Sequence, residues 1–311
     1  MAGKVKVQPV SRVGIEPLVA MAEQLRASLP GWDGTAPTGT RGQAPSDLAL
    51  DLAHLARHDG DGFLVASVGD EVVGFAASYV RSRQLTISQP WLLPEYLDHE
   101  VAEALLRRAL SYGDRSGATD VAAHLLSDAH WQAAFFRFGL RPRYPVYRLA
   151  LAPQAAHSAG QRLSSLLPGS ELTREALNRR AGAADLERLD RLARGVVRPM
   201  DHEYWLGGRR LRLAKVREGQ RISAYAYGGP GQCGPVAGAT TEAALAGIGW
   251  ALQLAAEGAT ESVHILVPAV FEAALENLFE VGAVCPATST WMSRHAASPH
   301  ERYVVPSVTI A

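Results

Sequence analysis

Titratable and aromatic side chains are densest in the run Asp201-His202-Glu203-Tyr204-Trp205. Carboxylate, imidazole and phenol groups accept or donate protons, and aromatic rings pack against organic ligands. This run is therefore the first place to expect a bound substrate or a reaction. A polar segment of this length is also typical of a loop or of the start of a helix, so that structural interpretation stays open.

Other catalytic patterns are missing from the sequence. No Ser, His and Asp residues form a recognisable triad, and no spacing typical of metal ligands is present. His54 and His58 lie one helical turn apart without a glutamate between them, which indicates a polar helix face. The only cysteines, Cys233 and Cys285, are too few for a disulfide framework or a zinc site. We expect no metal and a reducing compartment.

The composition is that of a globular protein, with 47% hydrophobic residues in a chain of 311. The 31 basic and 31 acidic residues cancel, so no net field attracts nucleic acid or an anionic membrane. The first ten residues lack the apolar block of a signal peptide, and no apolar run is long enough to span a bilayer. These features predict a cytoplasmic protein that binds neither nucleic acid nor membrane.

Hydrophobic periodicity predicts the same order of elements twice. Each copy has a strand hairpin, a third strand, a long helix, an apolar strand and a second helix. In the first copy they are predicted at 63–68, 72–80, 84–91, 98–116, 120–126 and 129–138. In the second copy they are predicted at 211–216, 221–227, 234–239, 241–256, 262–267 and 270–280.

Short sequence matches support this duplication. Gly117-Ala118-Thr119-Asp120 corresponds to Gly258-Ala259-Thr260-Glu261, and Gly139 corresponds to Gly282. The alternative is that these glycines only end helices, as they do in any α/β domain. The matching order of elements and the near-constant number of residues between equivalent positions favour a true repeat. The segment 153–170 is rich in Ala, Ser, Gln, Gly and Pro and is predicted as a linker. We therefore expect two mixed α/β domains, at 1–152 and at 171–311.

The first copy carries motifs of a known family. Trp91-Leu92-Leu93-Pro94-Glu95-Tyr96 leads into Glu103-Ala104-Leu105-Leu106, and Asp128, Trp131, Phe135 and Gly139-Leu140 follow at matching spacing. Over residues 63–149 the chain resembles the GNAT acyltransferase superfamily. The second copy resembles a divergent GNAT subtype through Gly234-Pro235-Val236-Ala237 and Leu278-Phe279-Glu280-Val281-Gly282. The resemblance implies a mixed α/β sheet in each of two tandem GNAT-like domains.

The resemblance also implies acetyl-CoA as a co-substrate, bound where a strand opens through a turn into a helix. Such a turn points backbone N–H groups and the positive end of the helix dipole at one spot. The family's Gln/Arg-x-x-Gly-x-Gly/Ala pattern is replaced by Leu97 to Ala102, where Asp98 and Glu100 repel a diphosphate unless they merely cap the helix. In the second copy Thr240 is either a phosphate ligand or the helix N-cap. The cofactor-binding residues implied are Leu93, Leu97, Asp98, His99, Val101, Ala102, Gly238, Ala239, Thr240 and Thr241.

The family commonly uses a tyrosine to protonate the leaving thiolate, but that place holds Phe135 in one copy and Leu278 in the other. Tyr144 and Tyr147 follow shortly and are the candidate acids, and Glu95 is the candidate base. The structural alternatives stay open: a strand tyrosine is often a core residue with a hydrogen-bonded hydroxyl, and a glutamate in a turn is often a solvated carboxylate. The resemblance places an acceptor-binding surface near His202, Glu203 and Tyr204.

The function implied is N-acetyl transfer from acetyl-CoA, or another acyl-CoA, to a small-molecule or peptide amine. The protein is expected to be a monomer or a homodimer. The alternative is a catalytically inactive GNAT fold that serves as a binding or interaction module.

Overall fold

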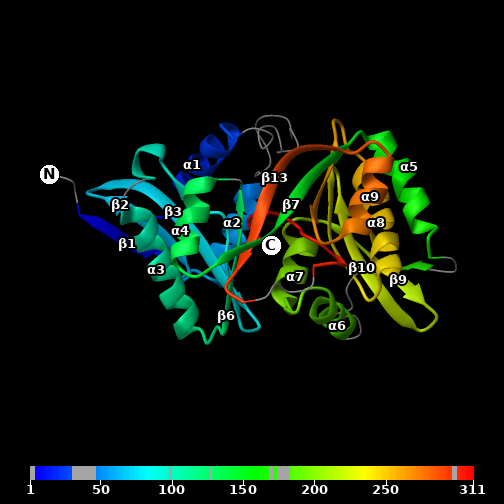
Figure 1. The fold of residues 1–311 in the computed structure, drawn as a ribbon, viewed down its shortest axis with the longest axis horizontal. Coiled ribbons are helices and arrows are strands. Elements are labelled where there is room, and N and C mark those ends of the chain that lie inside the picture. The colour runs from blue at the N-terminus through cyan, green and yellow to red at the C-terminus, as the bar shows by residue number, and fades with distance from the viewer. Residues whose placement is uncertain are drawn as a thin grey trace. The chain divides into compact units, whose positions relative to one another are not determined.

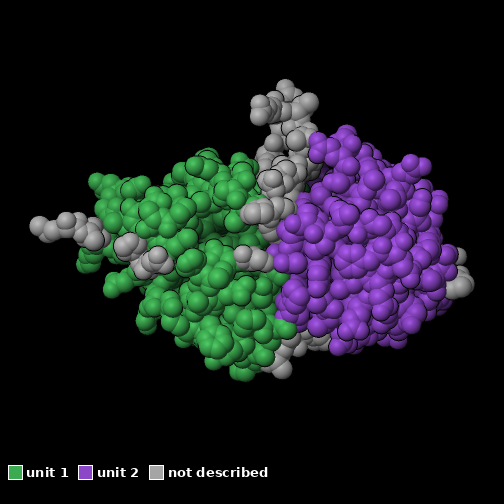
Figure 2. All heavy atoms as spheres, turned by 45° about the horizontal axis from the view of Figure 1, so that its top comes forward, with its two compact units in different colours: residues 1–143, 289–296, 308–311 green, residues 144–288, 297–307 purple. Residues whose placement is uncertain are grey.

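The chain folds into two compact units, which Figure 2 colours separately. Unit 1 comprises Met1–Arg143, Ser289–Ala296 and Val308–Ala311, and unit 2 comprises Tyr144–Thr288 and Ala297–Ser307. The computed structural model describes residues 4–29, 47–97, 100–126, 128–167, 183–295 and 300–311, together with the backbone of 171–173. None of the helices within these ranges is both long and apolar enough to cross a membrane.

The sheet of unit 1 places its strands in the order β1 (Val5–Pro9), β2 (Phe63–Val68), β3 (Glu71–Arg81), β4 (Gln84–Ile87), β6 (Asp120–Leu126) and the end of β13 (Val284–Ser293). Neighbouring strands are antiparallel except β4 and β6, which are parallel. A parallel pair needs a crossover connection. The long helix α3 (Glu100–Arg115) supplies it.

Helix α3 and helix α4 (Ala129–Arg137) share one apolar core with the sheet. Their contributions recur at helical spacing: Val101, Ala102, Leu105, Leu106 and Ala109 from α3, and Trp131, Ala134 and Phe135 from α4. The remaining helices are α1 (Glu16–Ala27) and α2 (Asp47–His58), and Figure 1 shows α2 on the other side of the sheet from α3. Gly117 and Gly139 follow α3 and α4 with positive φ values of 73° and 87°, which a residue with a Cβ rarely adopts.

The sheet of unit 2 follows the order β7 (Arg141–Leu151), β12 (Val263–Pro268), β11 (Gln232–Gly238), β10 (Arg221–Gly229), β9 (Arg212–Glu218) and β8 (Glu171–Thr173). Again one pair, β11 with β12, is parallel and the other neighbours are antiparallel. The crossover is α8 (Thr241–Ala256), followed after β12 by α9 (Glu272–Glu280). Two further helices, α6 (Ala183–Ala193) and α7 (Pro199–Gly207), precede β9.

A helix occupies most of the segment predicted as a linker. Helix α5 (Pro153–Ser164) begins with a proline at its first turn and buries Ala156, Ala159, Gly160 and Leu163. These small residues lie on one face, which packs against α8. The low-complexity appearance of 153–164 therefore reflects a close helix contact, because alanine and glycine allow two backbones to approach.

The order of elements confirms the duplication. Hairpin, third strand, helix, parallel strand and helix occur as β2, β3, β4, α3, β6 and α4, and again as β9, β10, β11, α8, β12 and α9. The predicted strand at 84–91 is interrupted, however, and forms β4 and the short β5 (Trp91–Leu92).

The two halves of the sequence exchange their last strands. After α4 the chain continues into β7, whose residues 146–151 pair with β12 in unit 2. After α9 it continues into β13, whose residues 289–293 pair with β6 in unit 1. Compact units and sequence repeats therefore do not share boundaries: residues 144–152 belong to unit 2, and 289–296 belong to unit 1.

Candidate functional site

Two parallel strands of unit 1 separate at their carboxyl ends. Strands β4 and β6 pair from Gln84 with Asp120 to Ile87 with Ala123. Beyond Ile87 the chain turns away, and β5 pairs with β3 instead of β6. Open α/β sheets bind ligands at the carboxyl ends of their strands. The opening between β4 and β6 is therefore the first place to look for a site.

One side chain bridges this opening. The amide N–H of Leu126 on β6 donates to Oε1 of Gln89 at 2.7 Å, and Nε2 of Gln89 donates to the carbonyl of Pro90 at 2.6 Å. Gln89 is only 5% exposed. Its amide satisfies a backbone donor that would otherwise lack a partner in the opening. Sequence reasoning missed Gln89, although the proline after it signals a break in the strand.

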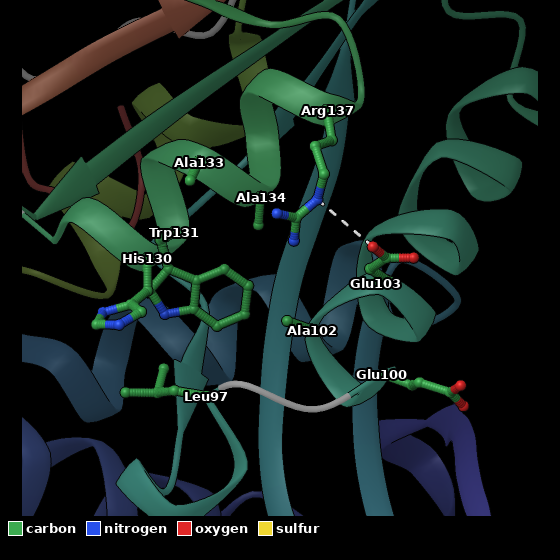
Figure 3. Close-up of a pocket in the computed structure, with 9 residues that line it drawn as sticks. All are labelled: Leu97, Glu100, Ala102, Glu103, His130, Trp131, Ala133, Ala134 and Arg137. Atoms are coloured by element: carbon green, nitrogen blue, oxygen red, sulfur yellow. Dashed lines mark ion pairs between the residues drawn. The ribbon is translucent and has the colours of Figure 1, made fainter.

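A pocket of about 450 Å³ lies between the first turn of α3 and one face of α4 (Figure 3). Small and apolar side chains form part of its wall, and four polar side chains complete it. The lining residues are Leu97, Glu100, Ala102, Glu103, His130, Trp131, Ala133, Ala134 and Arg137.

The charged groups of the pocket belong to the first turn of α3 and to α4. Glu100 and Glu103 occupy the first turn of α3, where carboxylates stabilise the helix dipole. Figure 3 shows Arg137 of α4 reaching toward Glu103, with Nε 3.5 Å from Oε1. Arg107 also contacts Glu103, at 3.2 Å. Because Arg137 is 60% exposed and Glu103 is 38% exposed, solvent screens this pair and leaves both side chains free to move.

His130 lies at the same pocket beside Asp128. Its Nδ1 is 3.6 Å from Oδ1 of Asp128, and the ring is 61% exposed. Asp128 is also the N-cap of α4, because Oδ1 accepts the backbone N–H groups of His130 and Trp131. The helix start therefore sets the position of the imidazole at the pocket.

Comparison with known proteins identifies this part of the chain. Residues 27–140, which include the pocket and the opening between β4 and β6, match the model of the acetyltransferase (GNAT) family. The chain carries a GNAT acetyltransferase domain. A search of curated proteins found no match.

Solved structures share the fold over nearly the whole chain. A putative acetyltransferase from Pyrococcus horikoshii superposes with a TM-score of 0.71 at 16% identity, covering 99% of this chain and 96% of its own. A tandem GNAT protein from the clavulanic acid biosynthesis pathway superposes with a TM-score of 0.59 at 13% identity, covering 94% and 99%. A GCN5-related N-acetyltransferase from Sphaerobacter thermophilus gives 0.59 at 13% identity, covering 94% and 96%. The tandem GNAT fold predicted from the sequence is confirmed.

The cofactor-binding residues predicted in the GNAT domain occupy different places. Leu97 and Ala102 line the pocket. Val101 is buried in the core, and the N–H of Leu93 donates to the carbonyl of Val73 at 2.9 Å, within the sheet. Asp98 and His99 lie outside the described residues. The cofactor role of these residues stays a prediction.

In unit 2 the predicted phosphate-binding amides already have partners. Gly238 donates to the carbonyl of Arg302 at 3.2 Å, and Ala239 donates to that of Ser223 at 2.8 Å. Thr240 is the N-cap of α8, with Oγ1 accepting from the N–H of Ala243 at 3.1 Å. Thr241 is the first residue of that helix. The capping alternative for Thr240 accounts for its geometry, and a cofactor role for the four residues stays a prediction.

The three residues predicted to move protons do not come together within one unit. Glu95 is exposed in the short helix η2 (Pro94–Tyr96) of unit 1 and does not line the pocket. Tyr144 and Tyr147 lie on the part of β7 that belongs to unit 2. The Tyr144 hydroxyl is buried against Nδ1 of His300, and burial raises its pKa well above the usual value. Tyr147 is half-buried against the core of unit 2.

The run at 201–205 forms part of helix α7 and contributes to a buried polar network. His202 places Nε2 3.0 Å from Oδ2 of Asp190 and Nδ1 2.9 Å from the hydroxyl of Tyr227. Burial raises the pKa of Tyr227, so its hydroxyl stays protonated, and both ring nitrogens of His202 have a buried polar partner. Of the predicted substrate residues, His202 and Tyr204 are buried and Glu203 is exposed.

Both positions at which the family uses a tyrosine are buried in the cores. Phe135 and Leu278 are 0% exposed. Neither can donate a proton. Within the described residues, no group of three or more His, Cys, Asp or Glu side chains is arranged to hold a metal ion.

Proposed function

We propose that unit 1 transfers an acyl group from acetyl-CoA, or from another acyl-CoA, to an amine. The observation that carries this proposal is the pocket of about 450 Å³ between the first turn of α3 and helix α4, inside the segment that matches the GNAT family. The acceptor is a small-molecule or peptide amine, as the family resemblance implies.

The pocket fits the apolar part of an acyl-CoA better than its diphosphate. Leu97, Ala102 and Ala134 offer small and apolar contacts for a narrow chain. The α3 N-terminus and Arg137 favour an anion, whereas Glu100 and Glu103 oppose it. We therefore expect measurable but weak binding, in which Arg137 leaves Glu103 to meet a phosphate.

Once bound, an acyl-CoA supplies a thioester carbonyl that a neutral amine attacks. The chain must remove a proton from the incoming ammonium and return one to the departing thiolate. His130 lines the pocket, and the ring nitrogens of an imidazole can accept or donate a proton, so this side chain is the first candidate for both steps. Glu95, exposed in η2, is the second candidate base, and the acid role of Tyr144 and Tyr147 remains a prediction of the sequence.

Calorimetric titration with acetyl-CoA, followed by detection of acetylated product across a panel of amines, tests the proposal. We expect one saturable binding event and transfer to at least one amine. His130→Gln should lower kcat by about 10²–10⁴-fold if the imidazole carries the proton. Glu95→Gln should show the same loss if the carboxylate is the base instead. No heat at millimolar acetyl-CoA would refute acyl-CoA binding.

A second function follows from the same pocket. Glu100 and Glu103 line the pocket, where they oppose a bound anion, and Phe135 is at the position of the usual acid. These residues suit a protein that keeps the fold as a binding module without transfer. Saturable acetyl-CoA binding with no product from any amine would favour this alternative.

A further inference from the structure

Unit 2 has its own opening between parallel strands, equivalent to the one in unit 1. Strands β11 and β12 pair only from Gln232 with His264 to Cys233 with Ile265. Beyond this point they separate, although β11 continues to Gly238 and β12 continues to Pro268. Their remaining backbone groups on the facing edges need other partners, because buried N–H and C=O groups rarely stay unpaired.

A segment from the end of the same chain fills this opening. Strand β14 (Tyr303–Val304) runs antiparallel to β11, with Val304 opposite Val236 and Tyr303 opposite Ala237. On its other side Val305 is bridged to Leu266 of β12, and its N–H donates to the Leu266 carbonyl at 3.0 Å. One segment thus pairs with both parallel strands and closes the gap between them.

Buried side chains hold this segment in place. Tyr303, Val304 and Val305 are each no more than 1% exposed, and Val304 belongs to the core cluster of unit 2. The hydroxyl of Tyr303 accepts from a guanidinium N–H of Arg198 at 3.0 Å, and Arg198 forms a fully buried ion pair with Asp201 at 3.0 Å. The segment is therefore anchored in both the apolar core and the polar network.

The same segment also occupies backbone groups just before the start of α8, including the N–H of Gly238, a donor that an anion there would need. The carbonyl of Arg302 takes the N–H of Gly238, and the Arg302 guanidinium donates to the carbonyl of Ala239. A Cβ on Gly238 would lie 2.5 Å from the nitrogen of Ala244, so β11 already touches the first turn of α8. These backbone groups of Gly238 and Ala239 are therefore hydrogen-bonded within the protein and do not depend on a ligand for a partner.

We propose that the opening between β11 and β12 is a strand-binding site occupied in cis by residues 302–305, which closes unit 2 to acyl-CoA. Each chain then has one donor site, in unit 1, a consequence that rests on the proposed function. The recognition is strand addition, in which main-chain hydrogen bonds hold the segment and alternate side chains fill pockets. Unit 2 keeps the acyltransferase fold with part of its own chain in place of a ligand.

Matched tryptophan substitutions locate the donor site. Ala133 is exposed on α4 and lines the unit 1 pocket, so Ala133→Trp fills the pocket with little risk to folding. Glu276 is exposed at the equivalent position of α9, so Glu276→Trp is the control. In calorimetry with acetyl-CoA we expect one site per chain for the unaltered protein and for Glu276→Trp. Ala133→Trp should lose binding at least tenfold.

Two sites per chain, or an unchanged site in Ala133→Trp, would overturn the proposal. Hydrogen–deuterium exchange tests the strand itself, with the N–H groups of Val305 and Gly238 as reporters. Both should exchange slowly with and without acetyl-CoA. Fast exchange in the free protein, or acceleration by acetyl-CoA, would show an unoccupied or displaceable site and would also overturn it.

The exchange measurement separates the two proposals. If acetyl-CoA does not bind at all, the proposed function fails. Slow exchange at Val305 and Gly238 would then still support the strand-binding site in unit 2, and fast exchange would refute it. Val304→Asp compared with Val284→Asp adds a second readout, because Val304 is 0% exposed and Val284 is 62% exposed. We expect faster exchange of the backbone N–H groups of residues 302–305 in Val304→Asp and unchanged exchange in Val284→Asp.

Discussion

At the scale of single residues, the first turn of α3 combines helix stability with a cost to anion binding. Glu100 and Glu103 stabilise the N-terminus of the helix, and both line the pocket. A carboxylate several ångströms from a phosphate in screened surroundings opposes binding by about 0.5–1 kcal/mol. The same two carboxylates therefore stabilise helix α3 and weaken the binding of the acyl-CoA donor.

Neutralising these carboxylates should tighten acyl-CoA binding. We expect Glu100→Gln and Glu103→Gln each to lower the Kd for acetyl-CoA by about 2–5-fold. The Glu103 change should act more strongly, because it also frees Arg137. Calorimetric titration at low ionic strength measures the effect.

The control is Glu242→Gln, which removes a carboxylate from the first turn of α8 in unit 2. It should leave the Kd unchanged. Weaker binding after Glu100→Gln would show that this carboxylate contacts the donor favourably, contrary to the repulsion argued above. Helix stability should fall by about 0.3–1 kcal/mol in each variant.

A buried histidine makes the stability of unit 2 depend on pH. Burial, and then the charge of Arg148, lowers the pKa of His264 to about 4. The unfolded chain takes up this proton near pH 6.5, before the folded chain does, so stability falls as the pH drops from about 6.5 toward 4. His264→Gln should flatten this part of the curve of unfolding free energy against pH.

The matched control for His264 is His157→Gln, an exposed histidine on α5. It should keep the slope of the unaltered protein. Denaturant titrations at several pH values between 4 and 7 measure both. An unchanged slope in His264→Gln would assign the pH dependence to other groups.

At the scale of elements, the contact between α5 and α8 depends on two glycines. A Cβ on Gly249 would lie 2.4 Å from the nitrogen of Ser164 and 2.7 Å from the oxygen of Gly160. A Cβ on Gly160 would in turn lie 2.7 Å from the oxygen of Gly249. Backbone atoms cannot move aside as a flexible side chain can, so the two helices would have to separate.

Gly249→Ala should therefore destabilise the protein by about 1–3 kcal/mol, the range for overpacked cores. Helix propensity alone would predict the opposite sign, because alanine favours a helix by up to about 1 kcal/mol over glycine. Gly207→Ala in α7 is the control, since no atom lies within 4 Å of its added Cβ. Chemical denaturation should show a loss for the first variant and a small gain for the second.

At the scale of the whole molecule, exchanged strands make the two halves of the sequence depend on each other. A fragment ending at residue 167 keeps β7 and α5, whose partners β12 and α8 lie in the other half. It also lacks the strand 289–293 that covers β6. An uncovered strand edge promotes aggregation.

Splitting the chain after residue 167 tests this dependence. Each fragment expressed alone should be insoluble, and the two expressed together should purify as one complex that binds acetyl-CoA like the intact chain. Affinity purification through a tag on one fragment measures the outcome. A soluble, cooperatively folded fragment 1–167 would instead support the predicted domain boundary at 153–170.

Much of the fold could be predicted from the sequence because the signals are local. Periodicity located α3, α4 and α8, and glycines such as Gly117 and Gly139 marked where helices end. The site was predicted less completely. Leu97 and Ala102 line the pocket, whereas Gln89, His130 and Arg137 were missed. The role of Gln89 follows from how β4 separates from β6, and that of His130 and Arg137 follows from how α4 packs beside α3.

The run Asp201-His202-Glu203-Tyr204-Trp205 shows the same division between local and long-range information. Residue types alone mark it as chemically rich, and its interior position depends on Asp190 and Tyr227, which are distant in sequence. Buried polar groups need partners, and no local pattern reveals which ones they find.

The sequence by itself determined the element order, the duplication and the resemblance to the GNAT fold. Only the tertiary structure decided that β7 and β13 are exchanged, that α5 replaces the expected linker, and that Tyr303–Val305 lies between β11 and β12. The physical reason is the distance along the chain over which each interaction acts. Propensity, capping and periodicity act within a few turns of chain, whereas strand partners such as Val236 and Val304 are selected by the packing of the whole unit.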